Sequence, residues 1–297
     1  MDDIPKFSAS VVITTKNRKE ELRTALKSVM AQTFVPELIV MDDGSTDGTA
    51  ALVQSEFPSA ILHRFETSQG LVVRRNQAAR LARGEIIFSM DDDAVFSTPR
   101  IIEQTLARFD QPEIGAVAIP YIDVNKDPRV FQAAPDDRGV WITSSFIGTA
   151  HALRREIFLK LNGYREALVH QGEESDFCIR LLAAGYVVRL GYGDPIHHLE
   201  SPKRDLRRMD FYGCRNSILF AWQNVPTLPL PLHLLGTTFN CLRWTFEPAR
   251  FVTRMGGILV GYRDCLKTDR RPVNRVAYKR WRQLKRNGSM LIDSSSP

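Results

Sequence analysis

The sequence has few cysteines and no closely spaced cysteine pair. Its four cysteines are spread over 297 residues and form no C-x-x-C pattern, which argues against a zinc knuckle and against a disulfide framework. We therefore expect reduced thiols and a cytoplasmic protein. The first residues, 1–6, lack the basic and apolar regions of a signal peptide, so we do not expect export.

Basic residues are not in excess along most of the chain. The net charge of +6 is concentrated in residues 243–286, where 13 lysines and arginines stand against three acids. That segment has a net charge of +10, so the remainder of the chain has −4. We therefore expect no nucleic-acid partner, because a uniformly basic surface is not indicated.

Residues 243–286 combine basic with aromatic side chains. We expect this segment to contact anionic lipid headgroups peripherally, at the inner face of a membrane, and the alternative is a solvated basic helix. The residues concerned are Trp244, Phe246, Arg250, Arg254, Tyr262, Arg263, Lys267, Tyr278, Lys279, Arg280 and Trp281.

Residues 216–242 contain no lysine, arginine, aspartate or glutamate. Their 27 residues are long enough to span a bilayer. However, several prolines interrupt the segment, and amide side chains such as Asn224 and Asn240 would stay unsatisfied in lipid. We expect buried helices or interfacial packing here.

Short apolar runs alternate with polar loops and helix-like segments. This order predicts an α/β fold with a Rossmann-like, mostly parallel sheet and helices on both faces. We expect this domain to cover residues 1–215 and a mainly helical, basic C-terminal extension to cover residues 216–297. The predicted strands are 10–14, 38–41, 61–65, 85–90 and 115–119, and the predicted helices are 49–55, 76–82, 98–109 and one that begins near residue 17.

The helix near residue 17 has two local signals. Asn17 and Glu20 have the spacing of a capping box, with Asn in place of the usual Ser or Thr. Apolar residues follow at helical spacing, which predicts one face packed on the sheet. These residues are Leu22, Ala25, Leu26, Val29 and Met30.

Acidic groups directly follow two of the predicted strands, at residues 42–43 and 91–93. The carboxyl ends of parallel strands meet at one edge of the sheet, so we expect these loops and residues 14–18 to surround one pocket. Carboxylates gathered so closely need a cation. Oxygen ligands suit Mg²⁺ or Mn²⁺ bridging a substrate diphosphate.

Four stretches of the sequence carry a resemblance to a known family: "SVVITTKNRKEELRTALKSVMAQT", "ELIVMDDGSTDGT", "GLVVRRNQAARLARGEIIFSMDDD" and "GEESDFCIRLLAAGY". In this order they resemble bacterial family-2 inverting glycosyltransferases with a GT-A fold, over roughly residues 8–200. The resemblance implies a nucleotide-sugar half up to about residue 120 and an acceptor half after it.

The resemblance implies a nucleotide pocket. Thr14 would meet the nucleotide, and Asp43 would accept a hydrogen bond from the base, which favours UDP, dTDP or GDP donors. Arg74 would supply a basic group, and we expect Asn17 and Arg18 beside the nucleotide as well. The alternatives are that Thr14 only packs and that Arg74 is a surface charge.

The resemblance also implies a metal site. Asp91 and Asp93 form the family's D-x-D pattern, in which Asp92 would approach the ribose and Asp93 would hold the metal. His197 or His198 would complete the metal shell, and the sequence does not choose between them. The alternative is an exposed histidine pair without a ligand role.

The acidic residues in "GEESDFCIRL" supply the general base in the family. Glu174 is the candidate base, and Glu173 is the first substitute. Asp176 is expected on the acceptor side, with either a structural or an acceptor-binding role. All three residues also favour a helix N-terminus without any catalysis.

The resemblance thus implies a metal-dependent inverting glycosyltransferase of hexosyltransferase type. It would move a sugar from a nucleoside diphosphate to a hydroxyl of a saccharide or lipid-linked acceptor, in cell-surface polysaccharide or glycolipid synthesis. A sugar nucleotidyltransferase is an alternative, although "TTKNRKEE" lacks the glycines of a triphosphate loop. A non-catalytic nucleotide-binding or scaffold protein is the second alternative.

Overall fold

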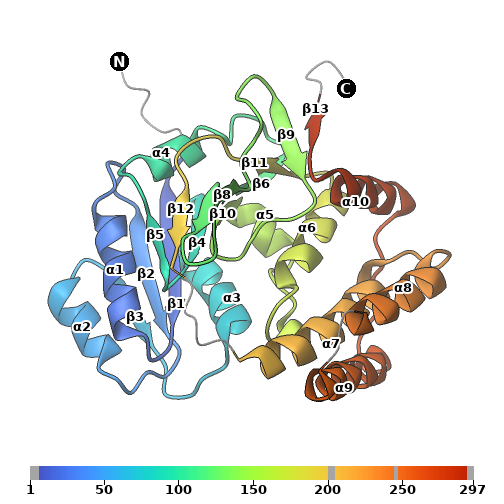
Figure 1. Ribbon diagram of the computed structural model, residues 1–297. Helices are drawn as coiled ribbons and strands as arrows, with labels where there is room; N and C mark the ends of the chain where they lie inside the picture. Colours follow the sequence, from blue (N-terminus) through green and yellow to red (C-terminus); the bar gives the residue numbers. More distant parts are fainter. Residues whose placement is uncertain (1–6, 200–204, 244–246, 293–297) are drawn as a thin grey trace.

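The central sheet has the predicted α/β architecture. The computed structural model describes residues 7–199, 205–243 and 247–292 (Figure 1). Within these residues the sheet has nine strands in the order β13-β9-β11-β6-β10-β4-β1-β2-β3. Strands β1 to β4 are mutually parallel, and so are β6 and β11, whereas β9, β10 and β13 run antiparallel to their neighbours. The strands are β1 (Ala9–Thr15), β2 (Glu37–Asp42), β3 (Ile61–Arg64), β4 (Ile86–Asp91), β6 (Ile114–Ala118), β9 (Val140–Thr143), β10 (His151–Arg154), β11 (Val187–Leu190) and β13 (Met290–Ile292).

Helices cover both faces of this sheet, because successive strand residues point to opposite sides. Val11 of β1 packs with Leu22 of α1 on one face, where α2 and α4 also lie. Val12 packs on the other face with Val72 of α3 and Phe177 of α6, next to α5. The helices are α1 (Lys19–Met30), α2 (Thr49–Glu56), α3 (Leu71–Leu81), α4 (Ile101–Leu106), α5 (Arg155–Lys160) and α6 (Glu173–Ala183).

A second, four-stranded sheet lies beside the edge where the parallel strands end, in the order β5-β12-β7-β8. In this sheet β12 lies between the antiparallel β5 and the parallel β7, and His198 is paired with Ala94 of β5 and with Asp123 of β7. This pairing brings residues 196–198 next to the acidic residues at 91–93, about one hundred positions earlier in the sequence. The strands are β5 (Ala94–Phe96), β7 (Tyr121–Asp123), β8 (Asp127–Phe131) and β12 (Ile196–His198).

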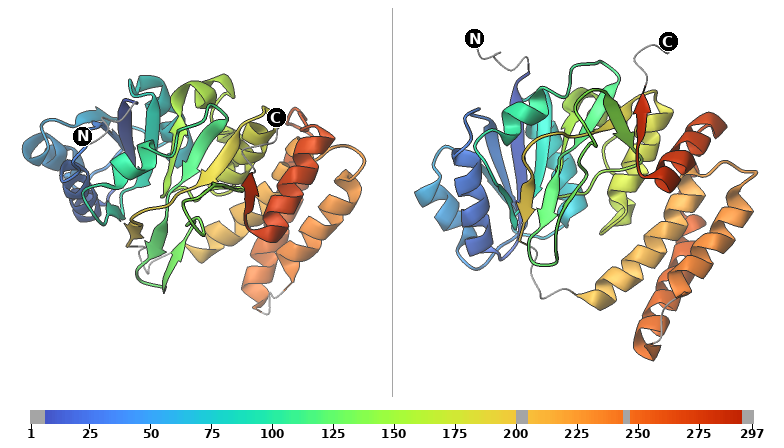
Figure 2. Two further views of the ribbon diagram at one scale, coloured as in Figure 1. Left: turned by 90° about the horizontal axis from the view of Figure 1, so that it is seen from above. Right: turned by 45° about the horizontal axis from the view of Figure 1, so that its top comes forward.

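The C-terminal part is mainly helical, as predicted, and its helices group on one side of the sheet (Figure 2). Helix α7 runs continuously across residue 216, so we propose that the extension begins with α7 rather than at the expected division. Strand β13 returns to the central sheet and pairs with β9. In the described residues, no helix is both long enough and apolar enough to cross a membrane. The helices are α7 (Leu206–Asn224), α8 (Leu230–Leu242), α9 (Pro248–Cys265) and α10 (Arg275–Asn287).

The start of α1 differs from the prediction. Asn17 has a left-handed backbone (φ 54°), and its side-chain oxygen accepts a hydrogen bond from the Thr46 N–H at 2.7 Å instead of capping α1. The carboxylate of Asp47 accepts from the Lys19 N–H at 3.1 Å in its place. The capping-box prediction is therefore wrong, because a neighbouring loop competes for the Asn17 side chain. The predicted apolar face is buried except for Met30, which is 54% exposed.

Candidate active site

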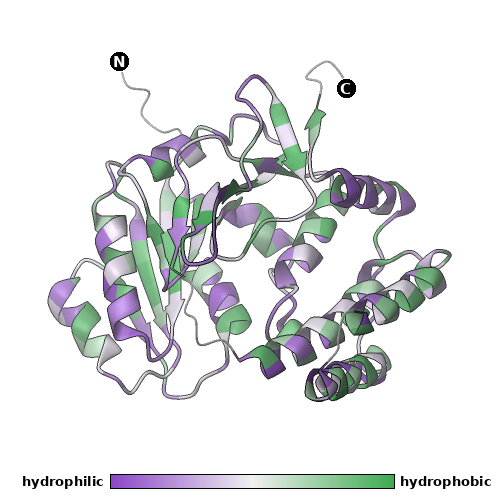
Figure 3. Ribbon diagram, viewed as in Figure 1, coloured by the Kyte–Doolittle hydropathy of each residue, from purple (hydrophilic) through white to green (hydrophobic). Residues whose placement is uncertain are grey.

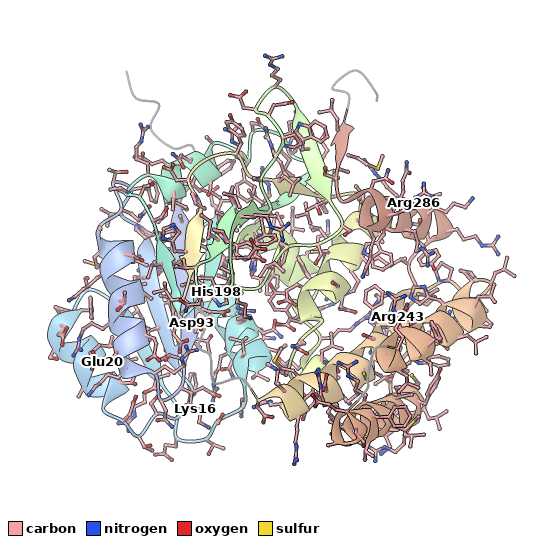
Figure 4. All side chains as sticks on the ribbon, viewed as in Figure 1. Lys16, Glu20, Asp93, His198, Arg243 and Arg286 are labelled. Carbon is pink, nitrogen blue, oxygen red and sulfur yellow. The ribbon has the colours of Figure 1, made fainter. Side chains whose placement is uncertain are left out.

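The structure brings Asp91, Asp93 and His198 together at the end of β4. One ligand atom from each lies within 4.8 Å of the others, and Figure 4 shows Asp93 and His198 side by side. Strand β12 turns successive side chains to opposite faces, so His197 does not join this group. Of the two histidines that the sequence left open, His198 is the one beside the carboxylates.

Asp93 is held in its ionised form. One carboxylate oxygen, Oδ2, lies 2.9 Å from an Arg18 guanidinium nitrogen, and the other, Oδ1, lies 3.4 Å from His198 Nε2. Burial opposes ionisation, but the hydrogen bond from His198 and the charge of Arg18 outweigh it and lower the pKa of Asp93 to about 2. The same contact with Asp93 raises the pKa of His198 against the effect of burial.

Two carboxylates hold these groups in place. Asp92 is buried and accepts a hydrogen bond from Thr15 Oγ1 at 2.8 Å, and it lies 3.0 Å from Arg18. Burial raises the pKa of Asp92 to about 7. Asp123, which sequence reasoning missed, lies 3.8 Å from Nδ1 of His198. This distance is too long for a hydrogen bond, and the charge of Asp123 acts with that of Asp93 in raising the pKa of His198.

Arg75 is the second residue that sequence reasoning missed, and it connects the two halves of the site. Its guanidinium donates to Asp91 Oδ1 at 2.7 Å and to the Gly148 carbonyl at 2.9 Å. It also lies 3.5 Å from Glu173. The buried guanidinium of Arg75 therefore balances the negative charges of Asp91 and Glu173, which would otherwise repel one another.

Glu173 and Glu174 begin α6 on the far side of Arg75. Burial, followed by the negative charge of Glu173, raises the pKa of Glu174 to about 8. Burial also raises the pKa of Glu173. Glu173 is buried and Glu174 is half-buried. Two adjacent carboxylates with so little contact with solvent cannot both ionise freely, so the pair can hold a proton near neutral pH.

A glycine makes room for Glu174. A Cβ atom on Gly148 would lie 2.6 Å from the Glu174 carboxylate and 2.9 Å from the Arg75 guanidinium. Any larger residue at this position would therefore push the two charged groups apart.

Asp43 and Arg74 form a saturated buried cluster. The Asp43 carboxylate accepts from Ser68 Oγ at 2.6 Å, from the N–H groups of Gln69 and Gly70 at 2.9 Å each, and from Arg74 Nε at 2.6 Å. Burial is outweighed by these donors, so the pKa of Asp43 is lowered. A base N–H would have to displace one of these donors, and the Ser68 hydroxyl rotates most easily.

Arg74 is not a surface charge. It is 2% exposed, its guanidinium lies 3.5 Å from the centroid of the Phe65 ring, and it donates to Gln77 and to the Thr67 carbonyl at 2.7 Å each. Its observed contacts fix the loop beside Asp43. A direct contact of Arg74 with nucleotide therefore stays a prediction.

The remaining candidates have distinct surroundings. Thr14 is buried, and its hydroxyl lacks a partner among the described residues. Asn17 ties its loop to Thr46, as described above. Asp176 is fully buried and accepts from Arg165 at 2.5 Å, from Arg180 at 2.9 Å and from Asn224 at 2.7 Å. These contacts favour the structural alternative for Asp176.

The Asp91, Asp93 and His198 group fits a divalent cation by its chemistry. It offers two carboxylates and one imidazole within reach of a single ion, and the low pKa of Asp93 keeps that ligand unprotonated. Mn²⁺ and Mg²⁺ both accept carboxylate ligands, and imidazole is the more usual partner of a transition metal.

The family follows from comparison with known proteins. The model of glycosyl transferase family 2 matches residues 10–161, which is about half of the chain, and the chain belongs to this family. Its fold is that of the GT-A glycosyltransferases. A mannosyltransferase from Pyrobaculum calidifontis, solved in complex with GDP-Man and Mn²⁺, superposes with a TM-score of 0.60 and 18% identity, over 95% of this chain and 80% of that one.

Three curated relatives have similar sequence identities to this chain. An uncharacterized glycosyltransferase from Haemophilus influenzae is 29% identical, over 58% of this chain and 61% of the relative. A glucosyl-dolichyl phosphate glucuronosyltransferase from Haloferax volcanii is 27% identical, over 59% and 63%. The succinoglycan biosynthesis protein ExoU from Rhizobium meliloti is 28% identical, over 59% and 57%. The chain thus spans about three fifths of the length of these relatives.

Proposed function

We propose that this chain is a metal-dependent inverting glycosyltransferase that moves a sugar from a nucleoside diphosphate sugar to a hydroxyl acceptor, in polysaccharide or glycolipid synthesis. The observation that carries the proposal is the line of groups from Asp93 through Asp91 and Arg75 to Glu173. These groups support a cation site beside a carboxylate pair with a raised pKa, at one edge of the sheet. Two of the relatives are named as a glucosyl-dolichyl phosphate glucuronosyltransferase and as a succinoglycan biosynthesis protein.

The residues divide into a donor side and an acceptor side. Asp91, Asp93 and His198 would hold a divalent ion, which would neutralise charge on the departing diphosphate. Arg75 holds the position of Asp91 and limits the repulsion between Asp91 and Glu173. On the acceptor side, Glu174 would accept the proton of the attacking hydroxyl. A single displacement of this kind inverts the anomeric centre.

Thermal unfolding with UDP, dTDP, GDP, ADP and CDP, each with and without Mn²⁺, tests the donor side without knowledge of the acceptor. A ligand at ~100 times its dissociation constant adds roughly 2.7 kcal/mol, which we expect to raise the melting temperature by several degrees. We expect one diphosphate to act only with metal. If no diphosphate stabilises the protein in either condition, the proposed donor site is wrong. Pyrophosphate release in a turnover assay would instead indicate a nucleotidyltransferase.

We also propose peripheral contact with an anionic membrane, with the contact surface shifted from the predicted one. Tyr278 and Trp281 are buried, and Arg254 pairs with Asp210, while Trp244 and Phe246 lie outside the described residues. Large apolar side chains are instead exposed on α8 and α9, and Figure 3 colours much of both helices hydrophobic. They are Leu228 just before α8, Leu232, Leu235 and Phe239 on α8, Val252 and Leu259 on α9, and Leu266 just after α9.

Sedimentation with lipid vesicles tests this contact. We expect Leu235→Gln with Phe239→Gln to weaken binding to vesicles containing phosphatidylglycerol by about 10²-fold or more, because each buried apolar side chain contributes about 1.5–3 kcal/mol. Val35→Gln is the matched control, since Val35 is 87% exposed in the loop after α1. If the wild-type protein, the double variant and Val35→Gln bound the vesicles equally, α8 would not be part of the membrane contact.

A further inference from the structure

A large cleft separates the start of α6 from the C-terminal helices. Its volume is about 1300 Å³, and α7, α8 and α10 form most of its walls. Gln171 and Gly172, just before α6, and Ser175, in its first turn, line the cleft. They flank Glu173 and Glu174 in the sequence. A molecule in this cleft would therefore lie next to the start of α6, the helix that carries the candidate base.

One wall of the cleft is strongly basic. Four exposed cations of α10 line it, at positions that share one side of the helix: Lys279, Arg282, Lys285 and Arg286. None of these four forms an ion pair with a carboxylate of the described residues. Among those residues, Asp210 is the one acid that lines the cleft, and it is already paired with Arg250 at 2.6 Å and with Arg254 at 2.8 Å.

Burial lowers the pKa of two side chains that line the cleft, and the positive charges of their neighbours lower it further. Burial and then the charges of Arg282 and Lys285 lower the pKa of His233, on the opposite wall, to about 4. Burial and the charge of Arg282 lower the pKa of Lys285 as well. His233 is therefore neutral at pH 7, and the cleft keeps an excess of positive charge that an anionic group would offset.

The opposite wall, α8, has two adjacent faces of different character. His233, Thr237 and Asn240 face the cleft. The apolar stripe of Leu232, Leu235 and Phe239 begins at the cleft, which Leu232 also lines, and continues on the solvent side. The cleft thus offers cations for a phosphate and an apolar surface next to it.

We propose that this cleft binds the acceptor and that the acceptor carries a phosphate or diphosphate group attached to an apolar chain. The cations of α10 neutralise the phosphate, and the apolar chain leaves along α8. The reactive hydroxyl lies on the part of the acceptor that points toward α6. This inference rests on the proposed function, because it assigns the acceptor of the same reaction.

Arg282 and Arg280 provide a matched pair of test variants. Both are exposed arginines of α10, but only Arg282 lines the cleft. We measure binding of a polyprenyl diphosphate in detergent micelles, and of inorganic pyrophosphate, in EDTA so that metal-dependent binding at the donor site is suppressed. Loss of a charge-assisted contact in Arg282→Gln is expected to raise the dissociation constant about tenfold, while Arg280→Gln changes it less than about twofold.

Gly236 offers a second test that does not alter charge. A Cβ atom at this position of α8 would meet no heavy atom within 4 Å, and Gly236 lines the cleft. Gly236→Trp is expected to place a bulky ring in the cleft and to raise the dissociation constant of the polyprenyl diphosphate about tenfold, whereas Gly236→Ala leaves it unchanged. Thermal unfolding of each variant with the donor diphosphate and Mn²⁺ shows whether the fold and the donor site are intact.

The outcomes separate this inference from the proposed function. If Arg282→Gln behaves as Arg280→Gln does, or if Gly236→Trp binds the polyprenyl diphosphate as tightly as Gly236→Ala, the cleft is not the acceptor site. If pyrophosphate binds as tightly as the polyprenyl compound, the apolar chain is refuted. Either failure leaves metal-dependent donor binding unaffected, whereas loss of donor binding by the wild-type protein overturns the proposed function itself.

Discussion

Glu174→Gln is expected to lower kcat by about 10²–10⁴-fold, the usual contribution of a general base. Glutamine keeps the size of the side chain in the narrow space beside Gly148 but cannot accept a proton. Binding of the donor should be unchanged, because Glu174 lies on the acceptor side of Arg75. Steady-state rates of sugar transfer, together with donor-induced thermal shifts, measure both effects.

The pH dependence of the same reaction distinguishes Glu174 from Glu173. With a pKa of about 8, Glu174 is increasingly protonated as the pH falls, so the rate should fall on the acidic side. Glu173→Gln removes the negative charge that helps to raise this pKa, so the acidic limb should move to lower pH. If Glu173→Gln instead loses more activity than Glu174→Gln, then Glu173 is the base.

Asp93→Asn is expected to abolish the metal-dependent stabilisation by the donor diphosphate and to lower the transfer rate by about 10²-fold or more. The substitution removes one of three potential ligands and leaves Arg18 with one carboxylate contact fewer. Thermal unfolding with and without Mn²⁺ reports the first effect separately from catalysis. A variant that kept full metal-dependent transfer would refute the central assignment.

The two histidines give the matched comparison for this site. His198→Gln should weaken the metal-dependent shift, because His198 belongs to the group with Asp91 and Asp93. His197→Gln should leave the shift unchanged, since strand β12 turns His197 to the other face. Equal effects from the two substitutions would contradict the metal group that we describe.

The sequence predicted the layered fold because the order of apolar runs and polar loops reflects a parallel sheet. It placed Asp91 and Asp93 correctly at the end of β4, since the apolar run of this strand changes to acidic residues at that point. It did not choose between His197 and His198, because that choice depends on the pairing of β12 with β5 and β7, which are distant in sequence.

Arg75 was missed for a related reason. Two arginines are adjacent at 74 and 75, and only the start of α3 decides which one faces the site. The helix begins at Leu71, five residues earlier than predicted, so the orientation of its side chains was not available from the pattern. The contact of Arg75 with Glu173 joins residues 98 positions apart, and no local signal in the sequence encodes it.

Strand β13 has a consequence for the acceptor cleft. It fastens the chain after α10 to β9 of the central sheet, and before α10 the Val273 N–H donates to the Asn224 carbonyl of α7 at 3.0 Å. Between these two attachments, the Trp281 ring packs against Phe220 with 5.1 Å between centroids. The basic wall is therefore preorganised, so a ligand would gain affinity without first having to order the helix that receives it.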